Sequence, residues 1–212
     1  MIVACVNVGD AYDDKYVYNL RDAVQRSLSL PYEFVCLADH NIPGVTVIRI
    51  NDDRTPGWWA KLHLFRDDII PVGDRVLYLD LDTLIPGKLD DIAQCDGKFM
   101  MLEDFYHPDD LASGVMLFES GGNEAIFTDW LSFGAPKLRK GDQSWISMHR
   151  PLAGRLQEVF PDRIKSFKAS AAPQDCDILC FHGRPRPHEC DGWVADLWNN
   201  RRLASQGDNH VS

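Results

Sequence analysis

The feature that most constrains the fold is a short apolar run, Val-Leu-Tyr-Leu at residues 76–79, that leads directly into Asp80-Leu81-Asp82. An apolar run of this length, bounded by polar residues, predicts a buried strand over residues 75–79. Strands of this kind occur in parallel sheets that are covered by helices on both faces. The run therefore favours an α/β fold with two acidic side chains at the carboxyl end of a buried strand.

The segments around this run alternate between strand and helix patterns. Further strands are expected at residues 2–8, 33–38, 45–50, 99–102, 115–118, 164–167 and 178–181. Helices are expected from Asp13 or Asp14 to before Pro31, and at residues 58–68, 123–133, 142–148 and 192–203. In the second helix, Trp58, Leu62 and Phe65 are expected on one apolar face. We expect one domain over residues 1–204, followed by a polar tail at 205–212.

Composition and charge exclude several classes of function. The net charge of −10 disfavours nucleic-acid binding, which requires a basic surface. No apolar run approaches the roughly 18 residues of a transmembrane helix, and residues 1–8 have no basic flank, so we interpret them as a strand and not as a signal peptide. The six cysteines are scattered, and we expect reduced thiols in a cytoplasmic protein.

The Asp-x-Asp motif has the chemistry of a metal site. Residues i and i+2 of an extended chain point to the same side, so Asp80 and Asp82 can reach one ion. Carboxylate oxygens suit Mg²⁺ or Mn²⁺, and both ions leave coordination positions open for phosphate oxygens. Ligands of open α/β sheets bind at such strand ends. The alternative is a polar turn that Pro86-Gly87 completes.

Other short blocks follow the same order along the chain as in a known group of enzymes. The blocks are Val3-Ala4-Cys5-Val6-Asn7, Trp59-Ala60-Lys61-Leu62, Leu79-Asp80-Leu81-Asp82, Met101-Leu102-Glu103-Asp104, Ser113-Gly114-Val115-Met116 with Gly141-Asp142-Gln143, and Phe181-His182-Gly183-Arg184-Pro185-Arg186-Pro187. Together they resemble the GT-A glycosyltransferases, and within them family 8, which includes glycogenin and bacterial galactosyltransferases. The resemblance implies a GT-A fold, with a mostly parallel central sheet flanked by helices.

The resemblance also implies a role for each matched residue. Asp80, Asp82 and His182 would bind Mn²⁺ or Mg²⁺. The nucleotide and its diphosphate would be contacted by Val6, Asn7, Tyr12, Lys61, Asp80, Gly183, Arg184 and Arg186. Asp104 and Asp142 would orient hydroxyls of the donor sugar, and Gln143 would lie near its anomeric carbon.

Two positions depart from the family pattern. Ala112 stands where family 8 usually has Asn, which puts acceptor-side or sugar-side contacts there in doubt. Arg184 and Arg186 replace a single Lys, and either guanidinium could bind phosphate through two hydrogen bonds. Alignment to the cation-Pro pair favours Arg186.

The function implied is transfer of a sugar from a nucleoside diphosphate, expected to be UDP, to an acceptor hydroxyl with retention of configuration. The acceptor is unknown and could be a glycan, a lipid-linked glycan or a protein. The loop at residues 105–112 is either an acceptor wall or a plain surface loop. A peripheral membrane contact by the C-terminal Trp193, Trp198, Arg201 and Arg202 is an alternative to packing of the tryptophans on the core.

Three other classes of function remain open. A haloacid-dehalogenase-type phosphatase also carries Asp-x-Asp after an apolar strand, but normally continues with Gly-Thr, where this chain has Thr83-Leu84. A zinc module could use the cluster Cys176, Cys180, His182, His188 and Cys190, although its spacing is not a standard one. A non-catalytic sugar-nucleotide binder could share the same pocket. Singly, Asp142 could be a helix cap and His182 an ordinary half-buried imidazole.

Overall fold

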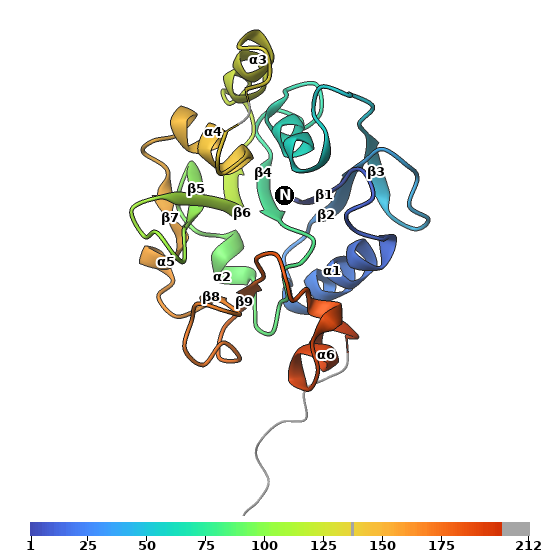
Figure 1. Ribbon diagram of the computed structural model, residues 1–212, viewed down its shortest axis with the longest axis vertical. Helices are drawn as coiled ribbons and strands as arrows, with labels where there is room; N and C mark the ends of the chain where they lie inside the picture. Colours follow the sequence, from blue (N-terminus) through green and yellow to red (C-terminus); the bar gives the residue numbers. More distant parts are fainter. Residues whose placement is uncertain (137, 201–212) are drawn as a thin grey trace, which may run out of the picture.

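The computed structural model describes residues 1–136 and 138–200, and a central sheet runs through this part of the chain (Figure 1). The strands are β1 (Ile2–Asn7), β2 (Glu33–Ala38), β3 (Thr46–Arg49), β4 (Arg75–Leu79), β5 (Phe99–Glu103), β6 (Leu111–Glu119), β7 (Gly154–Arg155), β8 (Ile164–Ser166) and β9 (Ile178–Cys180). The α-helices are α1 (Asp14–Ser27), α2 (Asp90–Ala93), α3 (Ala125–Ser132), α4 (Asp142–His149), α5 (Leu156–Val159) and α6 (Trp193–Trp198), and the 3₁₀ helices are η1 (Gly57–Phe65) and η2 (Pro187–Glu189).

The central sheet has seven strands in the order β3-β2-β1-β4-β6-β5-β7. The strands of the first half pair in parallel, as predicted, and β5 also pairs in parallel with β7. β6 runs antiparallel to both β4 and β5, so the sheet is mixed, with four parallel pairings and two antiparallel ones. The predicted α/β architecture is thus confirmed.

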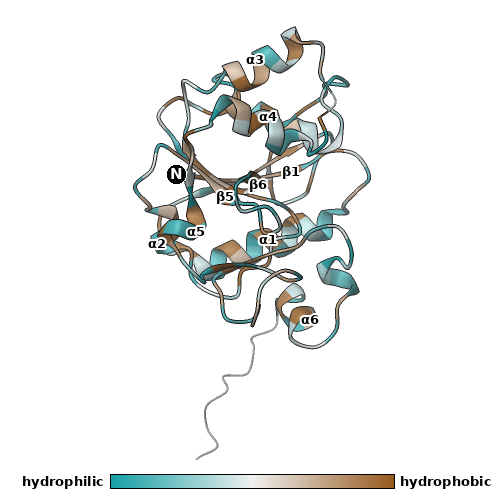
Figure 2. Cartoon of the chain, turned by 60° about the vertical axis from the view of Figure 1, so that its left-hand side comes forward, coloured by the Kyte–Doolittle hydropathy of each residue, from teal (hydrophilic) through white to brown (hydrophobic). Residues whose placement is uncertain are grey.

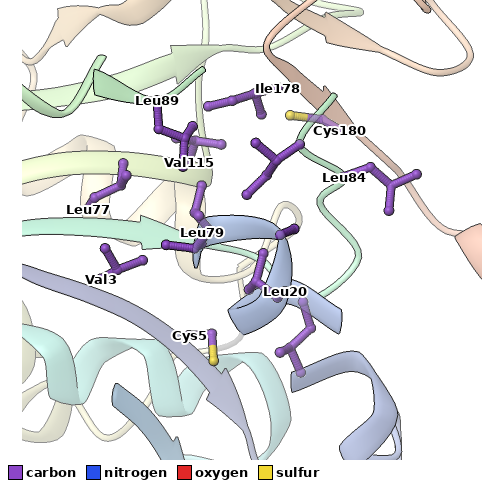
Figure 3. Close-up of a cluster of buried hydrophobic side chains, with 14 of the residues drawn as sticks. Val3, Cys5, Leu20, Leu77, Leu79, Leu84, Leu89, Val115, Ile178 and Cys180 are labelled. Atoms are coloured by element: carbon purple, nitrogen blue, oxygen red, sulfur yellow. The ribbon is translucent and has the colours of Figure 1, made fainter. Parts of the chain in front are cut away.

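Alternation along the strands gives the sheet two apolar faces. In β4, Leu77 and Leu79 pack into one buried cluster, whereas Val76 and Tyr78 pack into the other. The first cluster joins the sheet to α1, α2 and the β8–β9 pair, and Figure 3 shows Leu79 near Leu20 of α1. The second cluster joins it to η1, α3 and α4. The result is three layers, with α3 and α4 on one side of the strands and α1 on the other (Figure 2).

The segment after residue 56 differs from the prediction. It forms the 3₁₀ helix η1, which has about three residues per turn. All residues from Trp59 to Phe65 are buried, so this part of η1 has no exposed face. Trp58, which was expected on an apolar face with Leu62 and Phe65, is 65% exposed. The prediction for Trp58 was wrong because the buried run begins one residue later, at Trp59.

Other elements begin or end a few residues away from their predicted boundaries. β6 begins at Leu111, inside the predicted loop of residues 105–112, because its first residues pair with the end of β5 past an irregularity at Met101/Leu102. The short elements α2, β7, α5 and η2 were not predicted. α6 occupies residues 193–198, and residues 201–203 of the predicted helix and the predicted tail at 205–212 lie outside the described residues. Within the described residues, no helix combines the length and the apolar character needed to cross a bilayer.

The topology brings distant segments to one edge of the sheet. β1 and β4 are parallel neighbours, so their carboxyl ends lie together. β6 starts beside them, because the Asp80 N–H donates to the Gly114 carbonyl at 2.9 Å. Reciprocal hydrogen bonds between Leu84 and Leu179 bring the end of β9 to the same edge. Polar residues that follow these strands are therefore neighbours in space.

Candidate active site

A pocket of about 410 Å³ opens at this edge of the sheet. Its volume is within the usual range for small-molecule sites. Nine of the thirteen predicted site residues line it: Val6, Tyr12, Lys61, Asp80, Asp82, Asp142, Gln143, His182 and Gly183. They come from the ends of β1 and β4, from η1, from the start of α4 and from the segment after β9. Ala112, the departure from the family pattern, also lines the pocket.

Asp80 is the better exposed of the two motif aspartates. Its Oδ1 accepts a hydrogen bond from the Tyr78 hydroxyl at 2.6 Å and lies 3.1 Å from the Lys61 ammonium. Its Oδ2 lies close to Gly114, where an added Cβ would be only 3.2 Å from that oxygen. A glycine at position 114 therefore leaves room for the carboxylate.

Asp82 is buried and poorly compensated. Its Oδ2 accepts a hydrogen bond from the Tyr12 hydroxyl at 3.0 Å. Burial, and then the negative charge of Asp80, raise the pKa of Asp82 well above its usual range. Ionised Asp82 is thus costly in this arrangement, and a nearby cation would relieve that cost.

Lys61 connects the motif to Asp142. The ammonium is buried and lies 2.9 Å from Asp142 Oδ2, 3.1 Å from Asp80 Oδ1 and 3.1 Å from Ser113 Oγ. The Ser113 hydroxyl in turn donates to Asp142 Oδ2 at 2.7 Å. Burial alone would lower the pKa of Lys61, but the charges of Asp142 and Asp80 outweigh burial and raise it. Lys61 is therefore charged, and its three N–H groups already have partners within the protein.

Asp142 does not cap its helix. The cap position of α4 is Gly141, and Asp142 is the first helical residue, with its carboxylate directed to Lys61 and Ser113. Negative charge is favourable there because it faces the positive end of the helix dipole. The predicted alternative role of Asp142 as a cap is therefore not what the structure shows.

Asp104 lies just outside the pocket lining and is joined to it through Gln143. Its Oδ2 accepts from Lys140 at 2.9 Å and from the Gln143 amide at 3.4 Å, and its Oδ1 accepts from two backbone N–H groups. Burial raises the pKa of Asp104, but these hydrogen bonds outweigh burial and leave the pKa below its usual value. Asp104 is thus ionised and positions Gln143.

His182 lines the pocket with an unsatisfied nitrogen. Its Nε2 is buried and has no hydrogen-bond partner among the described residues. Burial lowers the pKa of His182 despite the nearby charges of Asp80 and Asp104, so the imidazole is neutral. A neutral imidazole with a free nitrogen has the form that binds metal ions.

The donor set fits a divalent cation by its chemistry. Two carboxylates and an imidazole line one pocket, the nearby charge of Lys61 does not offset the burial of Asp82, and His182 Nε2 lacks a partner. As the side chains stand, Asp80 is turned to Lys61 and Asp82 to Tyr12. Within the described residues no three His, Cys, Asp or Glu side chains are close enough to hold one ion. Common ligation by Asp80, Asp82 and His182 therefore stays a prediction.

Three predicted nucleotide contacts lie outside the pocket lining. Asn7 is buried and donates to Asp14 at 3.3 Å. Arg184 forms an ion pair with Glu189. The Arg186 guanidinium lies 4.5 Å from the ring centroid of Tyr12, which itself lines the pocket. Arg186 thus contacts a residue of the pocket wall, and which of the two arginines binds the diphosphate stays a prediction.

Sequence reasoning missed three residues of this site. Tyr78 was assigned only to the strand, although a hydroxyl two residues before Asp80 points to the same side of the chain. Ser113 belongs to the block Ser113-Gly114-Val115-Met116, but nothing in the sequence indicates its contact with Asp142. Trp58 lines the pocket because it lies near the start of η1, ahead of the buried run at residues 59–65.

The zinc alternative gains no support from the cysteine-rich segment. All six cysteines are free thiols, and Cys5, Cys36, Cys95 and Cys180 are buried. In the described part of the chain, that segment included, no three metal-binding side chains lie close enough to share an ion. His188 instead contacts the Tyr16 hydroxyl.

Solved structures with a similar fold are glycosyltransferases. The chain superposes on glycosyltransferase GlyE of Streptococcus pneumoniae TIGR4 with a TM-score of 0.67 and 16% identity, covering 96% of this chain and 60% of that one. An active-site mutant of LgtC matches with a TM-score of 0.64 and 15% identity over 94% of both chains. The galactosyltransferase LgtC in complex with donor and acceptor sugar analogs matches with a TM-score of 0.54 and 14% identity, over 97% of this chain and 98% of that one.

These similarities establish the fold. The predicted GT-A fold, a central sheet flanked by helices, is confirmed. The chain spans only 60% of the GlyE chain that it matches. No protein-family model matches the sequence, and neither does any curated protein.

Proposed function

We propose that the protein is a metal-dependent glycosyltransferase of the family 8 type that moves a sugar from a nucleoside-diphosphate sugar, with UDP as the nucleoside diphosphate, to an acceptor hydroxyl. The observation that carries the proposal is the convergence of nine predicted residues, from five separate segments, on one pocket. The same fold is found in LgtC, whose structure was solved with donor and acceptor sugar analogs. A shared fold alone would not support the activity, but a shared fold with the reacting residues in one pocket does.

The acidic end of the pocket would receive the diphosphate. A divalent ion held there by Asp80, Asp82 and His182 would neutralise charge on the leaving diphosphate as a Lewis acid. Tyr12 carries the Arg186 guanidinium on its ring, so a short movement of Arg186 would bring a cation to the diphosphate. Val6 and Gly183 line the wall against which the nucleoside would lie.

The other end of the pocket would orient the donor sugar. Asp142 is fixed by Lys61 and Ser113 and has the accepting oxygens that sugar hydroxyls need. Gln143, positioned by Asp104, would lie beside the anomeric carbon. Gln143 is a poor nucleophile, which supports retention by front-face substitution and not by a covalent intermediate.

Substitution of the motif aspartates tests the proposal. Asp80→Asn and Asp82→Asn each remove one carboxylate charge with little change in volume, so the protein is expected to fold while both sugar transfer and donor hydrolysis are lost. The assay follows release of UDP from UDP-sugars with Mn²⁺ or Mg²⁺, with Asp53→Asn, an exposed carboxylate elsewhere, as the control. Full activity of both variants, with or without chelator, would remove the metal from the mechanism.

The same protein preparation distinguishes the phosphatase alternative. A haloacid-dehalogenase-type enzyme would hydrolyse p-nitrophenyl phosphate, and we expect no such hydrolysis. A binder without activity would retain UDP-sugar affinity but release no UDP over many turnovers.

A further inference from the structure

Two large aromatic side chains are exposed beside the pocket. Trp58 lines it and is 65% exposed. Tyr106 is 56% exposed, and its ring centroid lies 6.0 Å from that of His182, which lines the pocket. Among the described residues, the other exposed large apolar side chains do not line the pocket; they are Val72, Phe133, Met148, Leu152 and Val159. Contact between aromatic surface and water is unfavourable. A ligand that covers such surface on a pocket wall therefore gains binding free energy.

The position of the Trp58 side chain is fixed by its neighbours. It is the second residue of η1, and the residues that follow it, 59–65, are all buried. Its indole rests on Gly141, where an added Cβ would be 2.9 Å from the indole nitrogen, and Gly141 has a positive φ of 62°. The ring is therefore held against the turn that leads directly to Asp142 and Gln143. The indole N–H makes no hydrogen bond to the described part of the protein, so it is available to a ligand.

Tyr106 is held to the same turn from the other direction. The Asp104 carboxylate accepts from the Tyr106 N–H at 2.9 Å, and the Lys140 ammonium binds both Asp104 and Asp110, at 2.9 and 2.8 Å. Arg155 donates to the carbonyls of residues 108 and 109. The loop at residues 104–110, and with it the backbone of Tyr106, is thus anchored to Lys140, the neighbour of Gly141. The Trp58 indole touches the same segment, residues 140–143, which comprises the end of the turn and the first two residues of α4.

This arrangement has the chemistry of a sugar-binding site. A pyranose ring presents an apolar C–H face and a rim of hydroxyls. An aromatic face with a free N–H donor, next to the amide of Gln143, complements both features. The nucleoside diphosphate is expected near Tyr12 and Asp82, which also line the pocket. We propose that Trp58, the turn at residues 140–143 and Tyr106 form the acceptor subsite, and that the acceptor is a saccharide whose ring stacks on Trp58. This inference rests on the proposed glycosyltransferase function.

The experiment compares variants W58A, W58F and Y106A with F133A. Phe133 is an aromatic side chain of similar exposure, 73%, that does not line the pocket, so F133A is the matched control. Three reactions of each protein are measured: hydrolysis of the nucleotide sugar by water, transfer to the methyl glycosides of glucose, galactose, mannose and N-acetylglucosamine, and transfer to glycerol, which has hydroxyls but no ring. Donor hydrolysis needs no acceptor, so it reports on the donor site alone.

We expect the wild type to prefer a methyl glycoside to glycerol. W58A should raise the KM for that glycoside about fivefold to tenfold and W58F less, and donor hydrolysis should fall by a clearly smaller factor in both variants. Y106A should raise the same KM by a smaller factor and keeps the inference testable should W58A fail to fold. F133A should match the wild type in all three reactions.

Several outcomes would overturn the subsite while leaving the transferase function intact. Equal use of glycerol and glycosides by the wild type would show that no ring is recognised. An equal loss of donor hydrolysis and transfer in W58A would place the nucleobase or the donor sugar on Trp58. The same loss in F133A would show a non-specific effect. If the wild type neither hydrolyses nor transfers from any nucleotide sugar, the proposed function fails first, and the acceptor subsite fails with it.

Discussion

At the scale of single residues, Lys61 organises the pocket. Its side chain is 4% exposed and carries a full charge, which is tolerated only because two carboxylates and the Ser113 hydroxyl surround it. The sequence predicted Lys61 as a nucleotide contact. In the structure Lys61 lines the pocket, but its ammonium donates to Asp80, Asp142 and Ser113. It therefore fixes the distance between the carboxylates of Asp80 and Asp142.

Removal of this ammonium should cost stability as well as activity. Lys61→Met leaves Asp142 buried without its cation, and we expect the free energy of unfolding to fall by about 3 kcal/mol. Lys140→Met is the matched control, because Lys140 also bridges two carboxylates but lies nearer to solvent. The control should lose less than about 1 kcal/mol. Urea denaturation measures both, and equal losses would contradict the role of burial at Lys61.

At the scale of elements, η1 is held in place by a buried imidazole. His63 is 1% exposed and lies 2.8 Å from Thr55 Oγ1 and 3.0 Å from the Arg66 guanidinium. Because Arg66 can only donate, His63 Nδ1 accepts and Nε2 carries the proton that is donated to Thr55. Burial, and then the charge of Arg66, lower the pKa of His63 from 6.5 to about 4.

This shift predicts how the stability depends on pH. Between pH 6.5 and 4 the unfolded chain binds a proton at His63 that the folded protein does not, so the free energy of unfolding falls as the pH falls. From pH 7.5 to pH 5 the loss from His63 should be about 2 kcal/mol. Urea titrations of wild type and His63→Gln at both pH values isolate this contribution from that of other groups. The glutamine variant should lose about 2 kcal/mol less, and parallel losses would contradict the assignment.

The turn before α4 requires a glycine at position 141. Gly141 has a positive φ and touches the Trp58 indole. Gly141→Ala should lower the free energy of unfolding by about 1–3 kcal/mol, because it adds both backbone strain and a clash. It should also change the tryptophan fluorescence by displacing Trp58. Gly122→Ala is the control, since it shares a positive φ but has open space at Cβ, and an unchanged spectrum in Gly141→Ala would contradict the contact with Trp58.

The long regular elements could be predicted from the sequence, and the short or irregular ones could not. β1, β2 and β4 are short apolar runs, and α1 has both a capping Asp13 and a regular apolar period, so local pattern was sufficient. A helix was predicted at residues 58–68, but the 3₁₀ form of η1 was not, because six of its nine residues are apolar and such a run carries no clear period. β7 has two residues and exists only because β5 pairs with it, so a tertiary contact decides its presence.

At the scale of the whole molecule, the site is assembled by topology. Asp80, Asp142 and His182 are far apart in sequence, and the order of quoted blocks predicted that they converge. What the sequence could not supply is which charges pair: Lys61 with Asp142, Tyr12 with Asp82, Arg184 with Glu189. Those pairings depend on rotamers that only the folded surroundings decide.

Because the pocket joins segments from both halves of the chain, its ligand should stabilise the protein as a unit. UDP with Mn²⁺ at 100 times its Kd would add about 2.7 kcal/mol to the free energy of unfolding. For a chain of 212 residues this corresponds to a rise in Tm of roughly 5 to 10 °C. Asp82→Asn should abolish the part of the rise that depends on Mn²⁺, whereas the exposed control Asp53→Asn should keep it. A rise that is the same with UDP alone, with UDP and Mn²⁺, and in Asp82→Asn would mean that the nucleotide binds without the ion, and the acidic strand end would then need another role.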